Sequence, residues 1–289
     1  MHEHPSPASS VVVGIDGSRS AIDAALWAVD EAVSRDIPLR LVYAIDPATA
    51  ASTDPHDAAR ELAKAEVAVR YAFMAVEATD QPVKIEVEIL QERPIRALRE
   101  ASRGAAMVCV GSMGLKHSSR GQIGSTAAAL AASAHCPVSI VRCHDPRSAR
   151  KRYVVVEVDA SSVSDGVLTH ALEQARLRGA PLQVLTTWQS RFTDRRDGDA
   201  VDDVSRLAAA QLDRRLAQWK KRYPELDVSA VAAHDSTLNY LTKNASSIQL
   251  FVTGHERAHG IGEIVGPPGY AALHNAGCSV LICEPRNLL

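Results

Sequence analysis

The chain has 289 residues, a length that favours two domains because a domain usually holds roughly 100 to 200 residues. Its 32 basic and 34 acidic side chains nearly cancel, which argues against a nucleic-acid partner or an anionic membrane surface. No hydrophobic run approaches the ~18 residues of a membrane span, and residues 1–10 lack the apolar block of a signal peptide. We therefore expect a cytoplasmic protein with no membrane partner.

Strands and helices are expected to alternate through the first half of the chain. The expected strands are Val11–Ile15, Leu39–Ile45, Val83–Ile89, Met107–Val110 and Val138–Arg142. Helical spacing follows the first three of them, at residues 22–33, 62–76 and 95–101, a loop is expected over 46–55, and a fourth helix starts within 124–133. Near-continuous apolar strands between helices predict a parallel, doubly wound sheet with helices on both faces. The third strand alternates hydrophobic and charged residues, which places it near an edge.

The second half of the chain repeats the first. Asp16 and Asp159, and likewise Gly111 and Gly254, lie 143 residues apart. Matching strands are expected near Val154–Val158, Leu182–Thr187, Val228–Val231, Leu250–Thr253 and Val280–Cys283. A period well above a hundred residues indicates two domains rather than a solenoid. We place the domains at residues 1–146 and 151–289, each with a five-stranded, mainly parallel sheet, and expect the linker at residues 145–152.

Metal and redox chemistry are not expected. The five cysteines form no CxxC pair, and four of them lie in or beside Val- and Ile-rich runs where a thiol acts as a small buried hydrophobe. His255 and His259 have a helical metal spacing but no evident third ligand. We therefore predict reduced thiols and no metal site formed by these histidines.

The most specific motif lies between the fourth strand and the following helix. It reads Gly111-Ser112-Met113-Gly114, then nine residues, then Gly124-Ser125-Thr126. Glycines let backbone approach a ligand, and a helix beginning near Gly124 offers N–H groups and a positive dipole end to phosphate. The intervening Lys116, His117 and Arg120 suit an anion, although a solvated surface loop has the same composition. The spacing is not that of a P-loop, and no GxGxxG follows the first strand.

Asp16 follows the first strand at the edge where open parallel sheets bind ligands. Its carboxylate could accept ribose hydroxyls or hold Mg²⁺. The alternative is a turn or helix-capping role, since Asp and Ser before a helix commonly have it.

The two motifs together resemble the universal stress protein family, most closely its tandem-domain actinobacterial type. They are Val-Gly-Ile-Asp-Gly-Ser at positions 13–18 and G-x2-G-x9-G-[ST] at 111–125, and the resemblance covers nearly the whole chain. It implies two Rossmann-like domains of the adenine nucleotide alpha hydrolase-like type. It also implies ATP as ligand, with Mg²⁺ as an accompanying ion and cyclic AMP as the alternative.

The resemblance also implies which residues bind the nucleotide. The residues carried over are Gly14, Ile15, Asp16, Ala44, Gly111, Met113, Gly114, Gly124, Ser125 and Thr126. Asp16 would meet the sugar or metal, the Ala44 backbone the adenine, and the glycine motif the ribose and phosphates. One departure is Gln91–Pro94, where many members have a glycine, so this loop could narrow the pocket.

The second half departs further from the family motif. Glu157 stands where the first half has Gly14, Arg257 replaces the second glycine, and Pro267 takes the place of Ser125. Proline has neither a hydroxyl nor an N–H to offer. We expect the second domain to have lost ordinary ATP binding and to act as a structural or regulatory partner.

No catalytic set accompanies the glycine motif, since the sequence shows no kinase signature, nucleophile elbow or paired carboxylates beside it. We expect a nucleotide-binding regulatory protein of the stress response. The alternatives are a slow ATPase or nucleotidyl-transfer enzyme that uses Asp16, Lys116 or His117, and a scaffold that binds no nucleotide. The last strands of both domains should lie at sheet edges, and we expect a homodimer; the sequence names no signalling partner.

Overall fold

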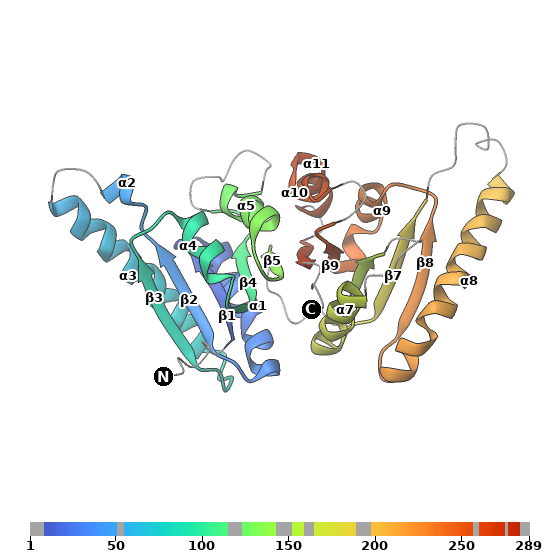
Figure 1. The fold of residues 1–289 in the computed structure, drawn as a ribbon, viewed down its shortest axis with the longest axis horizontal. Helices are drawn as coiled ribbons and strands as arrows, with labels where there is room; N and C mark the ends of the chain where they lie inside the picture. Colours follow the sequence, from blue (N-terminus) through green and yellow to red (C-terminus); the bar gives the residue numbers. More distant parts are fainter. Residues whose placement is uncertain are drawn as a thin grey trace, which may run out of the picture. The chain divides into compact units, whose positions relative to one another are not determined.

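A computed structural model describes residues 9–50, 55–114, 123–142, 152–158, 165–188, 198–256, 260–274 and 277–283. The chain divides into two compact units, Met1–His144 and Asp145–Leu289. In each unit a parallel sheet is flanked by helices (Figure 1). The expected α/β architecture is therefore present twice.

Five parallel strands form the sheet of unit 1. They are β1 (Ser10–Ile15), β2 (Leu39–Ala44), β3 (Ile85–Leu90), β4 (Ala105–Gly111) and β5 (Val138–Val141). Their order within the unit is β3-β2-β1-β4-β5. The order reverses at β1, so β1 and β4 carry their chain connections to opposite sides, which is the topology that creates a ligand crevice at the carboxyl edge. The expected edge position of the third strand is confirmed, and β5 ends the other side of this unit's sheet.

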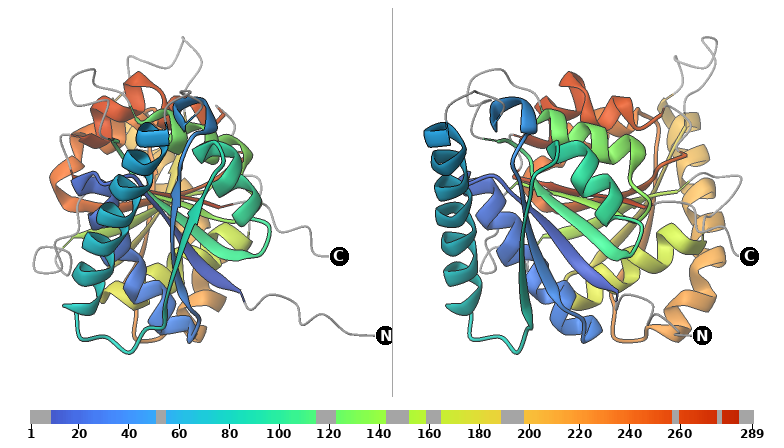
Figure 2. Two further views of the ribbon diagram at one scale, coloured as in Figure 1. Left: turned by 90° about the vertical axis from the view of Figure 1, so that its left-hand side faces the viewer. Right: turned by 60° about the vertical axis from the view of Figure 1, so that its left-hand side comes forward.

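Helices cover both faces of this sheet (Figure 2). Helices α1 (Arg19–Arg35) and α3 (Pro55–Glu77) lie on one face, and α4 (Pro94–Ala101) and α5 (Ser125–Ser133) lie on the other. The residues of β1 show why the strand reads as a hydrophobic run, because Val11, Val12 and Val13 are all fully buried between the two helical layers. Both faces therefore contribute to the core.

The loop expected over residues 46–55 is in part helical. Residues Pro47–Ala50 form the four-residue helix α2. Proline suits the first helical position, and the Asp46 carboxylate accepts the N–H of Ala48 at 2.9 Å. The expectation of a loop was wrong over these residues, because Asp-Pro starts a short helix here.

Unit 2 repeats the strand order with β10-β9-β6-β7-β8. Its strands are β6 (Tyr153–Glu157), β7 (Leu182–Thr187), β8 (Val228–Ala233), β9 (Ile248–Gly254) and β10 (Ser279–Cys283). Its helices are α7 (Asp165–Arg178), α8 (Gly198–Arg222), α9 (Thr237–Lys243), α10 (Gly262–Val265) and α11 (Pro267–His274), with a 3-10 turn at Ala245–Ser247. The 143-residue offset holds in the strand register, because Leu39 pairs with Ile85 and Leu182 pairs with Val228.

The cysteines behave as the sequence predicts where they are described. Cys109, Cys136, Cys278 and Cys283 are buried thiols outside any disulfide, and Cys143 lies outside the described residues. Burial raises the pKa of Cys283 far above its ordinary value. Among the described helices, none has both the length and the apolar character to cross a bilayer.

The residue after the first long helix of each unit has a left-handed backbone, and the two units fill it differently. Asp36 ends α1 with φ 52°, whereas Gly179 ends α7 with φ +56°. We predict that Gly179→Ala lowers the free energy of unfolding by about 1 kcal/mol, since a Cβ is strained in this region, and that Gly179→Asp lowers it less. Urea unfolding followed by circular dichroism measures both.

Gly262→Ala is the matched control, because an added Cβ there meets no atom within 4 Å and φ is not positive. This control should not destabilise the protein. An equal loss for Gly179→Ala and Gly262→Ala would contradict the conformational explanation.

Candidate functional site at the carboxyl edge of unit 1

Two of the predicted motifs meet at the carboxyl ends of the neighbouring strands β1 and β4. Asp16 directly follows β1, and the turn Ser112–Gly114 directly follows β4. Ser112 is buried, with its N–H donated to Val141 at 2.8 Å and its carbonyl accepting the N–H of Gly124 at 2.9 Å. The turn is thereby fixed to β5 on one side and to the start of α5 on the other.

The Asp16 carboxylate serves the local turn with one oxygen and faces the glycine turn with the other. Oδ1 accepts the N–H of Ser18 at 2.9 Å. Oδ2 lies 2.7 Å from the position that a Cβ would take on Gly114. Any side chain at Gly114 would therefore displace this carboxylate. The same residue thus stabilises its local turn with one oxygen and contacts the glycine turn with the other.

Ser20 connects helix α1 to the glycine turn. Its hydroxyl donates to the carbonyl of Met113. A Cβ on Gly111 would lie 2.6 Å from the Ser20 carbonyl carbon, a distance that real Cβ atoms do not reach. Gly111 thus has an internal reason to be glycine, namely the close approach of α1 to the end of β4. Ser20 was not selected from the sequence. Its position near the start of α1, two residues after Ser18, was the feature that could have indicated a contact with the site.

Two further motif glycines, Gly14 and Gly124, differ from each other in what surrounds them. A Cβ on Gly14 would lie 2.8 Å from Cδ1 of Leu98 and 3.2 Å from Cγ1 of Val110, so this glycine lets α4 approach β1. A Cβ on Gly124 would meet only ordinary contacts, the nearest being the Gly114 nitrogen at 3.6 Å. Among the described residues, no neighbour comes close enough to require glycine at position 124.

Helix α5 begins at this same edge. Gly124 is its N-cap and makes no side-chain capping bond. The first turn of a helix carries N–H groups without intrahelical partners and a partial positive charge, and both favour an anion. Ser125 is exposed and Thr126 is partly exposed, so their hydroxyls are accessible beside these N–H groups.

Strand β2 brings two further residues to the edge. Tyr43 pairs in register with Ile15, so Ala44, the last residue of β2, is level with Asp16. Burial raises the pKa of Tyr43, and the negative charges of Glu61 and Asp16 raise it further. The effect of Asp16 shows that the phenol and the carboxylate share one electrostatic environment; sequence reasoning did not select Tyr43.

The loop that departs from the family pattern carries two exposed long side chains and the start of helix α4. Gln91 and Arg93 are exposed, and Arg93 lies 4.0 Å from the Asp46 carboxylate. Pro94 begins α4. The cationic loop residues Lys116, His117 and Arg120 lie outside the described residues.

In unit 2 a partly buried polar cluster occupies the place of the Gly14 contact. The Glu157 carboxylate accepts the hydroxyl of Thr237 at 2.5 Å and that of Thr253 at 2.9 Å. Both threonines are buried, at 2% and 0% exposure. Hydrogen bonds to a carboxylate are roughly twice as strong as neutral ones. Glu157 therefore joins β6, β9 and α9 where unit 1 has only apolar contact.

The edge of unit 2 also differs in its helices. The short helix α10 packs so tightly against α11 that a Cβ on Gly269 would overlap the carbonyl oxygen of Ile264. Gly266 donates its N–H to Gly262 at 2.8 Å, and Pro267 has none to donate. The start of α11 consequently offers less to an anion than the start of α5. Arg257, His259, Asp159 and Ser161 lie outside the described residues.

No group of three or more His, Cys, Asp or Glu side chains in the described ranges is arranged to hold a metal ion. The Asp16 carboxylate is a hard oxygen donor at the site, and such donors suit Mg²⁺ held jointly with phosphate oxygens. The residues present are therefore compatible with Mg²⁺ as the companion of a nucleotide.

The fold defines a duplicated, parallel α/β protein in which the candidate residues meet at the carboxyl edge of unit 1. The model of the universal stress protein family matches residues 8–142 and 151–284. The chain belongs to the universal stress protein family, and it has the tandem-domain form.

Known relatives and structures agree with this assignment. The chain is 50% identical over 280 residues to universal stress protein Rv2028c of Mycobacterium tuberculosis, covering 96% of this chain and 97% of the relative. It is 46% identical over 287 residues to Rv3134c of the same species, covering 98% and 99%. A crystal structure of a universal stress protein from Archaeoglobus fulgidus shares the fold with a TM-score of 0.69 at 17% identity, covering 96% of this chain and 97% of that one.

The internal repeat provides a test of the α1 approach to β4. We predict that Gly111→Ala lowers the free energy of unfolding by about 1–3 kcal/mol, because the new methyl group overlaps Ser20 and the backbone must shift. The matched control is Gly254→Ala, where a Cβ meets only Cγ2 of Val167, at 3.3 Å. Urea midpoints compare the two, and equal losses would contradict the explanation.

Proposed function

We propose that unit 1 binds an adenine nucleotide, with ATP as the foremost ligand, and that binding shifts the conformation or assembly of a cytoplasmic stress-response protein. The nucleotide would lie along the carboxyl edge of the sheet. Its adenine would meet the Ala44 backbone, its ribose hydroxyls the free oxygen of Asp16, and its phosphates the start of α5.

The observation that carries the proposal is the arrangement of Asp16, Gly114 and Gly124. The carboxylate and the first turn of α5 both adjoin this glycine turn, because Asp16 Oδ2 faces Gly114 and the Gly124 N-cap of α5 contacts the turn from the other side. A carboxylate suits sugar hydroxyls, and a helix N-terminus suits phosphate. A ligand that carries sugar hydroxyls and a phosphate a few bonds apart, as a nucleotide does, therefore matches the carboxyl edge of unit 1.

Unit 2 is proposed to bind no nucleotide. The partly buried Glu157 carboxylate adds a negative charge to its edge, and Pro267 removes an N–H from the start of α11. Both changes act against a phosphate group, one by repulsion and one by loss of a donor. Its contribution would be structural, or it would respond to the nucleotide bound in unit 1.

The described part of the site contains positioning groups but no set for chemistry. Hydrolysis requires a residue that activates or orients water, and phosphoryl transfer requires an in-line acceptor with strong charge clamps. Asp16 already accepts the Ser18 N–H with one oxygen. We propose a nucleotide sensor in which turnover, if measured, is slow.

The test is calorimetric titration of nucleotide-free protein with ATP, with and without Mg²⁺. We predict one ATP bound per chain. Asp16→Ala should weaken binding about 10- to 100-fold, which corresponds to the loss of a charge-assisted hydrogen bond. Gly114→Arg, which copies Arg257 into unit 1, should weaken it at least as much because the new side chain displaces the Asp16 carboxylate.

Glu256→Arg is the control for the second variant, because Glu256 lies in the matching turn of unit 2. It should leave ATP affinity unchanged. Binding of two nucleotides per chain, or equal affinity for wild type and Gly114→Arg, would contradict the proposal. A preference for cyclic AMP over ATP would keep the site and change the ligand.

A further inference from the structure

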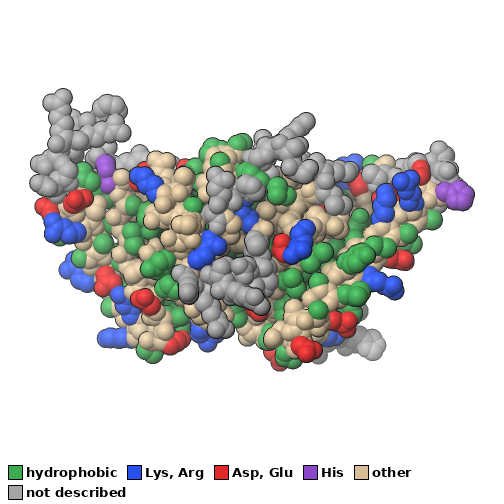
Figure 3. Space-filling model, turned by 180° about the vertical axis from the view of Figure 1, so that it is seen from behind, with side chains coloured by type: hydrophobic (Ala, Val, Ile, Leu, Met, Phe, Trp, Pro, Cys, Tyr) green, Lys and Arg blue, Asp and Glu red, His purple; other side chains and the backbone are tan. Residues whose placement is uncertain are grey.

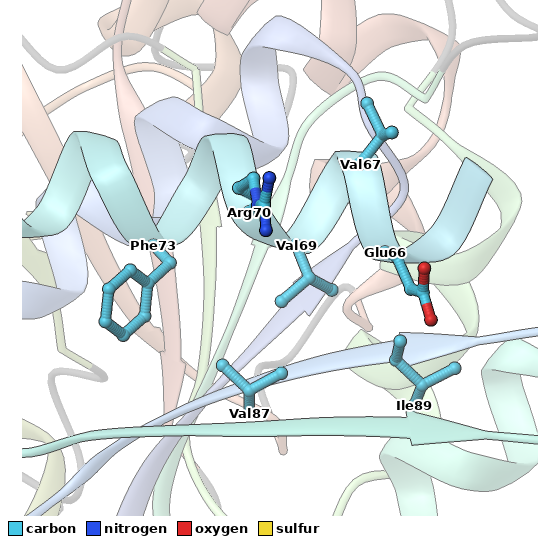
Figure 4. Close-up of a pocket in the computed structure, with 7 residues that line it drawn as sticks. All are labelled: Glu66, Val67, Val69, Arg70, Phe73, Val87 and Ile89. Atoms are coloured by element: carbon cyan, nitrogen blue, oxygen red, sulfur yellow. The ribbon is translucent and has the colours of Figure 1, made fainter. Parts of the chain in front are cut away.

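The outer side of unit 1 carries a hydrophobic surface at the end of the sheet that is remote from β5. Strand β3 is the outermost strand, and helix α3 lies beside it. A groove between the two is lined by Glu66, Val67, Val69, Arg70, Phe73, Val87 and Ile89. In Figure 4, Val69 and Val87 point toward one another across the groove while Val67 points away from β3.

The exposed face of α3 continues this surface outward. Val67, Tyr71 and Met74 follow each other at spacings of four and three residues, so they form one stripe along the helix. They are 54%, 63% and 57% exposed, and Val87 on β3 is 49% exposed. Figure 3 shows hydrophobic side chains among charged ones along this helix, on the right of the view. Large side chains exposed in a contiguous row are typical of an interaction surface.

The fold itself does not require this stripe, as unit 2 shows. With the 143-residue offset, Ala210, Arg214 and Ala217 of α8 stand in the places of Val67, Tyr71 and Met74. The buried side of the two helices is alike, because Val69 and Leu212 are each 4% exposed. The exposed hydrophobic residues of α8, Val204 and Leu207, stand at other positions of the repeat, so this particular stripe belongs to α3.

The charged residues beside the stripe, Glu66 and Arg70, are complementary to the same two residues on a second copy of the chain. Glu66 and Arg70 lie one helical turn apart, are both exposed and line the groove. In the described part of the chain neither forms an ion pair. A twofold axis between two antiparallel copies of α3 would bring each Arg70 to the Glu66 of the other copy, as an isologous contact requires. In unit 2, Asp213 stands in the place of Arg70 and pairs with Lys220 at 2.6 Å.

We propose that this surface, which we call the α3 face, binds a second copy of the chain. Val67, Tyr71 and Met74 would pack against their counterparts, with the two Glu66–Arg70 pairs beside them. One helix and one groove supply an area near the lower end of specific interfaces, about 1,200 Å² in total. The dimer is accordingly weak, with a dissociation constant on the order of 10–100 µM. The inference is independent of nucleotide binding.

The test is sedimentation equilibrium of nucleotide-free protein over a concentration series, with a charge-swap cycle. Glu66→Arg places two arginines together across the interface, and Arg70→Glu places two glutamates together. Each should weaken self-association at least tenfold. The double variant Glu66→Arg/Arg70→Glu should restore it, and an equimolar mixture of the two single variants should form a heterodimer.

Two further variants test the hydrophobic stripe. Tyr71→Arg copies Arg214 of unit 2 and should also weaken the dimer at least tenfold. Leu207→Arg on α8 is the matched control, because Leu207 is 66% exposed in unit 2, and it should have no effect. All four positions are exposed, so the melting temperatures should stay close to that of wild type.

The same measurements also show whether the chain self-associates through another surface or whether the α3 face binds a different protein. Self-association that survives Arg70→Glu and Tyr71→Arg uses another surface and would overturn the proposal. So would a wild-type protein that stays monomeric up to several hundred µM, about tenfold above the expected dissociation constant, since the α3 face would then serve a different protein.

Discussion

The close approach of helix α1 to the end of strand β4 is the contact on which the site of unit 1 depends. Ser20 donates to the carbonyl of Met113 and leaves no space for a side chain on Gly111. This contact fixes the turn that follows β4, and that turn positions Gly114 against the Asp16 carboxylate. Glycine at positions 111 and 114 is therefore explained by packing within unit 1, and the proposed ligand would bind beside the turn that this packing fixes.

Duplication allows the two units to be compared under nearly identical folding constraints. Strand order and the buried side of the long helices are alike, while the carboxyl edges and the outer helix faces differ. Unit 2 uses Glu157 and two threonines where unit 1 uses Gly14 and apolar contact. Unit 1 exposes a hydrophobic stripe where unit 2 has alanine and arginine. The two units thus share one framework of strands and helices but differ in the residues at their carboxyl edges and on their outer helix faces.

The sequence predicted the strands well, because most are short hydrophobic runs followed by a turn or loop, and it predicted the edge position of β3 from its charged alternation. It placed Asp16 and the glycine motif at one edge because parallel strands end together. It could not separate Gly111, whose close neighbour Ser20 requires glycine, from Gly124, which has no such neighbour among the described residues, because this difference depends on distances between elements that are far apart in sequence. Ser20 and Tyr43 were missed for the same reason, because their roles come from contacts distant in sequence.

Hydrogen exchange measured by mass spectrometry, with and without saturating ATP, tests the central claim most directly because it locates binding within each unit. The account predicts slower exchange in residues 14–18, 111–114 and 123–128, where the turn, the Asp16 loop and the start of α5 meet. It predicts unchanged exchange across residues 248–274 of unit 2. Protection confined to unit 2, or no protection in residues 111–128, would contradict it.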